Sequence, residues 1–235
     1  MAPRRANTPQ LTRKQIVAAA LKLIDEHGLE KHSMRQLGAE LGVDPTSVYH
    51  YVPSKSDLYD LLVDAVIDEF DFGAIDSSVT PPEQLVLAGH EMKRALLIHP
   101  RLMPLISTRS MRTPAQLGGV ERLLEILVAG GFSDSEAVSA LDVFGTYVFG
   151  AVNAYAAHLT DAEYHRDDRP REIDIAQLPN VARVFSDESN YLGFDVEFEV
   201  GVRALVEGLF ALHERGELAA VARRPAGWDS LKHTT

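Results

Sequence analysis

The chain has 235 residues and a net charge of −11, with 46% hydrophobic and 24% charged residues. This balance predicts a folded globular protein rather than a disordered one, and the length suits one large helical domain or a small domain joined to a larger one. The sequence contains no cysteine, which excludes a disulfide scaffold, a thiolate metal cluster and a cysteine nucleophile.

Charge is unevenly distributed along the chain. Residues 1–60 hold eight Lys or Arg and seven Asp or Glu, a net charge of +1, whereas the remainder holds 15 basic and 27 acidic residues, a net charge of −12. An acidic body argues against general affinity for polyanions. It still permits a near-neutral N-terminal unit to dock on a polyanion in one fixed orientation.

The first segment, residues 1–10, is polar and contains Arg4 and Arg5 with no apolar stretch behind them. It therefore does not resemble a secretory signal. We expect a flexible arm at residues 1–10 and a cytoplasmic protein.

Residues 11–56 carry closely spaced helix starts and stops. Three hydroxyl residues are each followed three positions later by Gln or Asp, the pattern of a capping box: Thr12, Ser33 and Ser54. Asp44 marks a fourth start, because its carboxylate can cap a helix whose first position suits Pro45. Gly28 and Gly42 are placed to end the first two helices.

Apolar residues between these positions recur at helical spacing. One face of the first helix holds Ile16, Ala19, Ala20, Leu23 and Ile24, and one face of the second holds Met34, Leu37 and Leu41. A tight turn at residues 42–44 then leads to another short helix. The pattern predicts a helix-turn-helix domain over residues 11–56, with its second helix presented outward.

That second helix carries three ring side chains. Val48 and Val52 are expected to pack inward, which leaves on the outward side and its edges Thr46, Ser47, Tyr49, His50 and Tyr51. Small hydroxyls can approach base edges of duplex DNA, while tyrosine hydroxyls, Lys55 and Arg35 can reach phosphates or a groove edge. Another interpretation is that one tyrosine fills a small three-helix core and that the histidine is an ordinary surface residue.

Residues 57–222 keep a helical period, with no convincing alternating strand and no repeat of fixed length. The helix that begins near Ser54 continues to about residue 70, and further helices are expected at residues 83–99, 101–107, 115–129, 134–159, 175–185 and 194–215. The apolar run 143–157 is shorter than the roughly 20 residues of a membrane span, so we expect a buried helix. The predicted fold is all-α, with a frayed tail at residues 223–235.

Two helices of this larger domain carry long apolar stripes. The first stripe is Leu141, Phe144, Val148, Val152 and Tyr155, and the second is Phe194, Phe198, Gly201, Leu205, Leu209 and Leu212. With their two-fold copies, the helices at about 134–159 and 194–215 can form a four-helix dimer interface. Core packing inside one chain explains the same stripes, and periodicity does not separate the two interpretations.

Five places in the N-terminal domain carry a recognisable pattern: Gly28 to Glu30, Met34 to Leu37, Glu40 to Val43, Ser47 to Val52, and Lys55. Their order and spacing resemble those of the TetR family of bacterial transcription regulators. The resemblance implies a homodimer that reads the major groove of operator DNA, with contacts from Arg35, Pro45, Thr46, Ser47, Tyr49, His50, Tyr51 and Lys55. Arg4 and Arg5 either enter a minor groove or only add charge.

A weaker likeness continues through the body. Lys93 to Leu97, Gly131 to Ser133, Phe149 to Val152 and Phe198 to Gly201 resemble the bodies of the tetracycline repressors within that family. The position of their magnesium-ligand histidine falls on Ile106 and that of its partner glutamate on Ala154, and neither side chain can hold a metal. The resemblance implies a ligand-binding body, while this departure argues against tetracycline with magnesium.

A small-molecule site is expected among the middle helices of the body. Large soft walls and a few polar groups make up the candidate set: Met92, His99, Met103, Met111, Phe144, Tyr147 and Asn153. Each of these residues, taken singly, is also explained as core filler. His90 and His99 have no third ligand at a persuasive spacing, so we predict no metal and no cofactor.

These observations predict a dimeric regulator, a repressor that a small-molecule effector releases from its operator. Two alternatives belong to other classes: an all-helical enzyme acting on a small apolar molecule with His90 or His99 as acid or base, and a helical adaptor. The sequence lacks a nucleophile elbow, a phosphate loop and an HExxH motif, which weighs against an enzyme. An adaptor would bind with little salt dependence, whereas DNA binding weakens steeply as salt rises.

Overall fold

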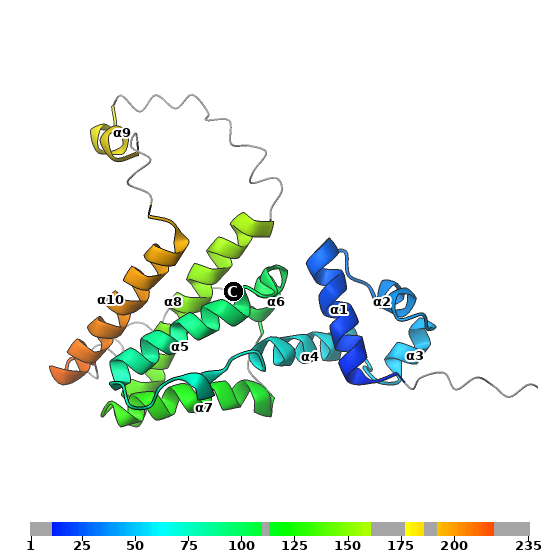
Figure 1. Cartoon of the computed structure of the whole chain (residues 1–235), viewed down its shortest axis with the longest axis horizontal. Coiled ribbons are helices and arrows are strands. Elements are labelled where there is room, and N and C mark those ends of the chain that lie inside the picture. Colours follow the sequence, from blue (N-terminus) through cyan, green and yellow to red (C-terminus); the bar gives the residue numbers. More distant parts are fainter. Residues whose placement is uncertain (1–10, 110–112, 161–176, 186–191, 219–235) are drawn as a thin grey trace, which may run out of the picture.

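The computed structural model describes residues 11–109, 113–160, 177–185 and 192–218. Every regular element within these ranges is helical, so the all-α prediction is confirmed. A small N-terminal head lies at one side of the molecule and a larger helical body at the other (Figure 1). The predicted arm at 1–10, the predicted tail at 223–235 and Met111 lie outside the described residues.

The helices of the N-terminal part are α1 (Arg13–His27), α2 (Met34–Glu40), α3 (Pro45–Tyr49) and α4 (Lys55–Ile67). Their starts follow the predicted caps. Thr12 makes a reciprocal capping box with Gln15, and the hydroxyls of Ser33 and Ser54 each accept the backbone N–H three residues on. Gly42 has φ +66°, a backbone conformation that glycine adopts without strain, in the turn between α2 and α3.

The body contains η1 (Phe72–Ala74), α5 (Pro81–Leu96), η2 (Pro100–Leu102), α6 (Met103–Ile106), α7 (Pro114–Ala129), α8 (Asp134–Thr160), α9 (Pro179–Phe185) and α10 (Phe194–Glu214). The helix predicted at 101–107 is divided into η2 and α6. Prolines occupy the first turns of α5 and α7, which begin one or two residues earlier than predicted. Helices α8 and α10 run side by side, and α9 lies apart from them (Figure 1).

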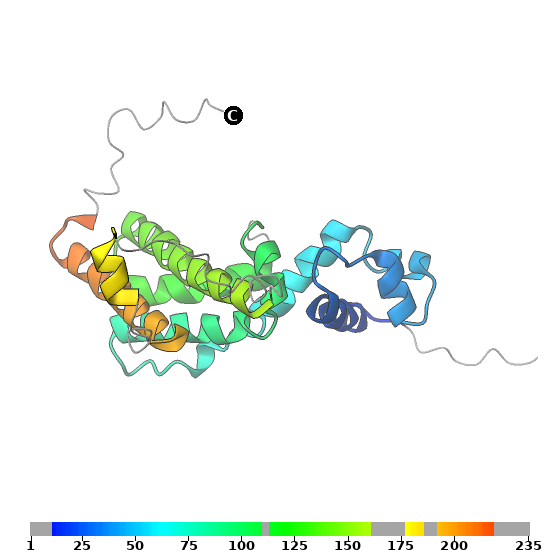
Figure 2. The ribbon, with the colours of Figure 1, turned by 90° about the horizontal axis from the view of Figure 1, so that it is seen from above.

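Helix α4 joins head and body through one continuous core. Leu58, Leu62 and Val66 of α4 are fully buried, in the same cluster as Ile16 of α1 and Leu123 of α7. Seen from above, α4 lies between the head and the body helices (Figure 2). A shift of the body against α4 would therefore move the head.

Helix α8 is long and apolar enough to cross a membrane, judged by length and composition alone. It is the one helix of which this is true among the described residues. It packs against α5, α7 and α10. Its residues Phe144, Val148 and Val152 are fully buried. The core helix of a soluble protein passes the same test, so this feature is weak evidence for a span. A buried helix was predicted, but 28% of its most apolar window is buried within the single chain, so the prediction holds for one face only.

Candidate DNA-binding face and effector cavity

The two helices of the helix-turn-helix cross closely because α2 carries a glycine at the contact. A Cβ atom on Gly38 would lie 3.0 Å from the carbonyl oxygen of Val43 and 3.1 Å from the nitrogen of Pro45. The Val43 N–H donates a hydrogen bond to the Gly38 carbonyl at 2.9 Å. This close backbone contact sets the position of α3 relative to α2.

Helix α3 presents polar and ring side chains outward. Asp44 Oδ1 accepts the Thr46 N–H at 2.8 Å, and hydrogen bonding from Thr46 lowers the pKa of this carboxyl. Val48 and Val52 are fully buried, as predicted. Of the predicted contact residues on this segment, the exposed ones are Thr46, Tyr49 and His50, and the half-buried ones are Pro45, Ser47 and Tyr51.

The two tyrosines differ in their surroundings. Tyr49 is 43% exposed. Tyr51 packs against the core, and its carbonyl accepts a hydrogen bond from Arg13 Nε at 3.1 Å. The interpretation of a tyrosine as part of a small core therefore applies to Tyr51, while Tyr49 projects from the head.

The two predicted basic contacts also differ. Arg35 is exposed in the first turn of α2. Lys55 is engaged within the head, because its Nζ donates to the His32 carbonyl at 3.1 Å and lies 5.3 Å from the centroid of the Tyr59 ring. Sequence reasoning missed this contact, since the lysine and the carbonyl are separated by 23 positions.

His32 is an unusual residue of the head. It is 4% exposed, and neither ring nitrogen makes a hydrogen bond to any part of the chain that the structure describes. Burial, with a smaller contribution from the charge of Lys55, lowers the pKa of His32. The folded head therefore favours the neutral imidazole.

A cavity of ≈ 640 Å³ lies in the body between α4, α5, α6, α7 and α8. Its aromatic walls are Phe70, Phe72 and Phe149, and its polar lining is Ser107, Arg109, Gln116, Asp142, Thr146 and Asn153. Two residues of the predicted pocket, Met92 and Asn153, line it. The mixture of apolar walls and a few polar groups is typical of a small-molecule site.

The other predicted pocket residues that the structure describes, Met103, Phe144, Tyr147 and His99, do not line this cavity. Met103 and Phe144 are fully buried core residues. The Tyr147 hydroxyl donates to the Phe198 carbonyl at 3.3 Å, toward α10, and burial raises the pKa of this phenol. Helical spacing predicted that these side chains point into the interior of the body. It could not show whether they pack in the core or line the cavity.

His99 forms part of the contact between head and body rather than the cavity lining. Its Nδ1 lies 2.7 Å from Asp25 Oδ2, which joins the start of η2 to α1. The two residues are separated by 74 positions, so their proximity could not be read from local pattern.

Gln116 and Arg109 line the cavity, were missed by sequence reasoning, and connect the cavity to α4 with the help of Thr113. Gln116 Nε2 and the Thr113 hydroxyl both donate to Asp64 Oδ1, at 2.7 and 2.5 Å. Arg109 pairs with Asp60 through its Nη1. The capping-box pattern of Thr113 and Gln116 was readable and is formed at the start of α7, but its link to α4 was not.

Residues 16–62 match the family model of bacterial regulatory proteins of the tetR family. Residues 80–212 match the tetracyclin repressor-like C-terminal domain. The chain belongs to the TetR family. It is therefore a helix-turn-helix transcriptional regulator, as the resemblance implied.

Relatives of this TetR-family chain include repressors of similar length. The HTH-type transcriptional repressor DrrR1 of Streptomyces coeruleorubidus is 31% identical, over 92% of this chain and 84% of its own. Tetracycline repressor protein class A from transposon 1721 of Escherichia coli is 26% identical, over 83% and 88% of the two chains. The crystal structure of apo ActR from Streptomyces coelicolor, 25% identical, has a TM-score of 0.74 and covers 91% and 99%.

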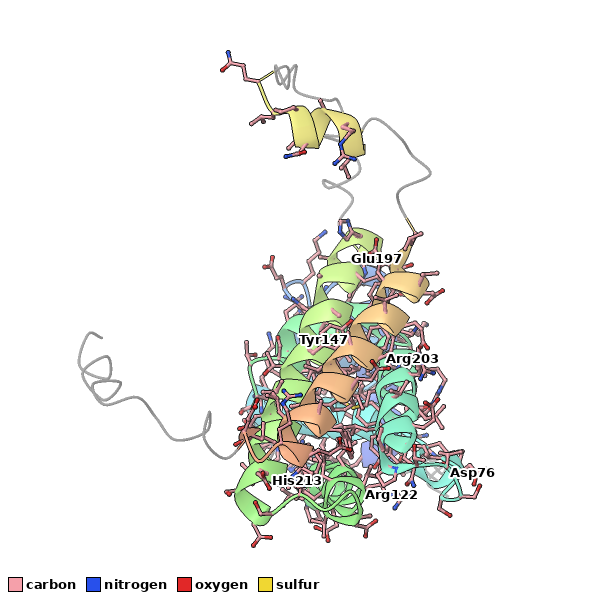
Figure 3. All side chains as sticks on the ribbon, turned by 90° about the vertical axis from the view of Figure 1, so that its left-hand side faces the viewer. Asp76, Arg122, Tyr147, Glu197, Arg203 and His213 are labelled. Atoms are coloured by element: carbon pink, nitrogen blue, oxygen red, sulfur yellow. The ribbon has the colours of Figure 1, made fainter. Side chains whose placement is uncertain are left out.

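His90, one of the two histidines considered as an acid or base in the enzyme alternative, lies in an ion-pair network of the TetR-type body. His90 contacts Glu199, and Arg203 binds both Glu199 and Glu83, linking α5 to α10 (Figure 3 labels Arg203). Hydrogen bonds from Arg203 lower the pKa of both glutamates. Neither His90 nor His99 lines the cavity. Within the described ranges, no three acidic or histidine side chains are grouped to hold a metal.

The apolar stripes predicted for a dimer are used largely inside the chain. Phe144, Val148, Val152, Phe198 and Leu209 are buried in the single-chain structure. A different face of the same helices is exposed, and it carries small or apolar residues: Val143, Gly150, Ala154, Val196, Val200, Ala204 and Gly208. Figure 3 shows α8 and α10 adjacent to each other at this side of the body.

Proposed function

We propose that this regulator is a cytoplasmic homodimeric repressor that binds operator DNA through α3 and releases it when a small molecule occupies the cavity. The observation that carries the proposal is the outward face of α3, where Tyr49, His50 and Thr46 are exposed beside the buried Val48. An exposed ring-bearing helix in a helix-turn-helix suits a groove of duplex DNA.

The proposed DNA contacts are the exposed and half-buried residues of the predicted set. We assign base-edge and phosphate contacts to Arg35, Pro45, Thr46, Ser47, Tyr49, His50 and Tyr51. Lys55 was predicted to contact phosphate, but its amine is bonded to the His32 carbonyl. Because Lys55 is exposed and an ammonium group has three N–H donors, we propose that it holds α4 against the head with one donor and contacts phosphate with another.

We propose that the dimer forms through the exposed face of α8 and α10. Val143, Val196 and Val200 are 45%, 46% and 58% exposed in the single chain, and small residues around them permit close helix approach. Asp142 and Asn153 line the cavity from the same helix and are also exposed. A partner subunit would then cover part of the cavity opening.

The effector part of the proposal rests on the cavity and on a relative. A space of ≈ 640 Å³ is within the size range of sites for drug-sized molecules. ActR, 25% identical to this chain, is known in a crystal structure with actinorhodin, at a TM-score of 0.73. We infer that this chain binds a small organic effector in the corresponding part of its body.

A fluorescence-anisotropy titration against the DNA that flanks the coding region tests this function. Arg35→Gln and Arg122→Gln remove the same charge, the first from α2 of the head and the second from α7 of the body. We expect the head variant to weaken binding about tenfold and the body variant to leave it unchanged. Affinity should fall steeply as salt rises. Equal effects of the two variants, or affinity independent of salt, would favour the adaptor alternative.

A further inference from the structure

Arg109 belongs to the cavity and to the head-connecting helix at the same time. It lines the cavity, and among the described lining residues it is the one cation. It also pairs with Asp60 of α4, donates from Nη2 to the Ser56 hydroxyl at 3.1 Å, and lies 5.6 Å from the centroid of the Tyr59 ring. The guanidinium thus joins the cavity wall to the first half of α4.

The part of α4 that Arg109 contacts leads directly to the head. Lys55 lies 5.3 Å from the centroid of the same Tyr59 ring and donates to the His32 carbonyl, just before α2. Residues 55–60 are therefore held from one side by the head and from the other by a cavity-lining arginine. A change in the partner of Arg109 alters one of these two attachments.

The cavity chemistry limits which ligand could change that partner. Phe70, Phe72 and Phe149 provide apolar aromatic walls, which suit a flat ring system. An uncharged ligand would leave the pair between Arg109 and Asp60 intact. A ligand with a carboxylate, sulfonate or phenolate could bind the guanidinium fork, because this group favours planar anions and pairs with them strongly away from water.

We propose that the effector is a flat, mainly apolar aromatic molecule with one anionic group, and that Arg109 binds this group in competition with Asp60. Binding of the anion weakens the attachment of α4 to the body and so loosens the head. This inference rests on the proposed function, since it takes the cavity as the effector site. It adds the chemical class of the effector and the residue that recognises its charge.

Two fluorescent probes of the same ring framework test the proposal on the full chain. 8-Anilinonaphthalene-1-sulfonate carries an anionic sulfonate, and N-phenyl-1-naphthylamine lacks it. In the unmodified protein the sulfonate probe should bind at least about tenfold more tightly, as expected for a charge-assisted pair. Arg109→Gln should abolish that preference while leaving the affinity for the neutral probe within about twofold.

Three further variants locate the site and test the competition. A Cβ on Gly145 would lie 4.0 Å from the Phe149 ring, so the Cβ of Gly145→Phe meets no close contact. Gly145 lines the cavity, and the new phenylalanine ring should fill part of it and block both probes. Asp60→Asn should strengthen binding of the sulfonate probe severalfold, because Arg109 then has no competing carboxylate. Arg122→Gln, the matched charge control on α7, should change neither affinity.

The outcomes separate this inference from the proposed function. If neither probe binds, or Gly145→Phe blocks neither, the effector cavity itself is wrong. If both probes bind in the cavity but Arg109→Gln leaves the preference intact, the cavity stands and charge recognition by Arg109 is overturned. If Asp60→Asn does not strengthen the sulfonate probe, the competition is overturned. The sulfonate probe should also raise amide hydrogen exchange at residues 55–60, and unchanged exchange would contradict the link to α4.

Discussion

Gly38 provides the sharpest test of how the head is built. In Gly38→Ala the new Cβ would lie 3.0 Å from the Val43 carbonyl oxygen, 3.1 Å from the Pro45 nitrogen and 3.2 Å from the Pro45 Cα. These atoms belong to the backbone of the turn and of α3, so they cannot move away as a flexible side chain could. Overpacking of this kind destabilises a protein by about 1–3 kcal/mol.

Alanine also favours the helix over glycine by about 1 kcal/mol, which offsets part of that strain. The net loss for Gly38→Ala should therefore be about 1 kcal/mol. Gly118→Ala on α7 is the matched control, because nothing lies within 4 Å of its added Cβ. It should gain up to about 1 kcal/mol from the same helix preference.

Thermal unfolding followed by circular dichroism measures the difference. A gap of about 2 kcal/mol between the two variants corresponds to roughly 4–8 °C in Tm for a domain of this size. Gly38→Ala should also bind DNA more weakly, since α3 must shift to relieve the contact. Equal Tm values for the two variants, with unchanged DNA affinity for Gly38→Ala, would refute the close-crossing argument.

Three further predictions concern the head and the dimer. Because the pKa of His32 is lowered in the folded protein, His32 of the unfolded chain is protonated at higher pH than His32 of the folded chain, and below about pH 6.5 the free energy of unfolding falls by up to about 1.4 kcal/mol per pH unit. In urea titrations His32→Phe should flatten this dependence of stability on pH. An unchanged dependence would contradict the role given to His32. Asp44→Ala should destabilise the protein through loss of the α3 cap. Because hydrogen bonding lowers the pKa of Asp44, this stabilisation should be present at pH 7 and disappear as pH falls below about 3.9. Denaturation of the variant that matches the unmodified protein at pH 7 would argue against the cap. Val200→Asp should raise the dissociation constant of the dimer at least about a hundredfold in analytical ultracentrifugation. Val128→Asp changes a similarly exposed valine of α7 and should leave this constant unchanged. Equal effects of the two variants would place the dimer interface elsewhere.

The head was predictable because its signals are local. The caps at Thr12, Ser33 and Ser54 depend on residues three positions away, and each formed at the expected place. The inward packing of Val48 and Val52 follows from their spacing of four residues. Exposure of the rings on α3 followed from these positions.

The body was less predictable, because its site depends on contacts distant in sequence. Spacing marks Phe144 as apolar-facing, but only the packing of α5, α8 and α10 decides that it fills the core. His99 was placed in the pocket and instead pairs with Asp25 of the head. Arg109 was missed, since its role arises from α4 residues 49 positions earlier.

We propose that two copies of the chain read a two-fold symmetric DNA site with α3. Selection of duplexes from a random pool by the full chain, followed by sequencing, tests it most directly, with Tyr49→Ala in parallel. We expect enrichment of a palindrome whose half-sites lie about one helical turn, 10–10.5 base pairs, apart centre to centre. The variant should enrich the same palindrome more weakly or with altered half-sites. Enrichment of no motif by a folded protein, or of an identical motif at equal strength by the variant, would contradict operator reading by a dimer through α3.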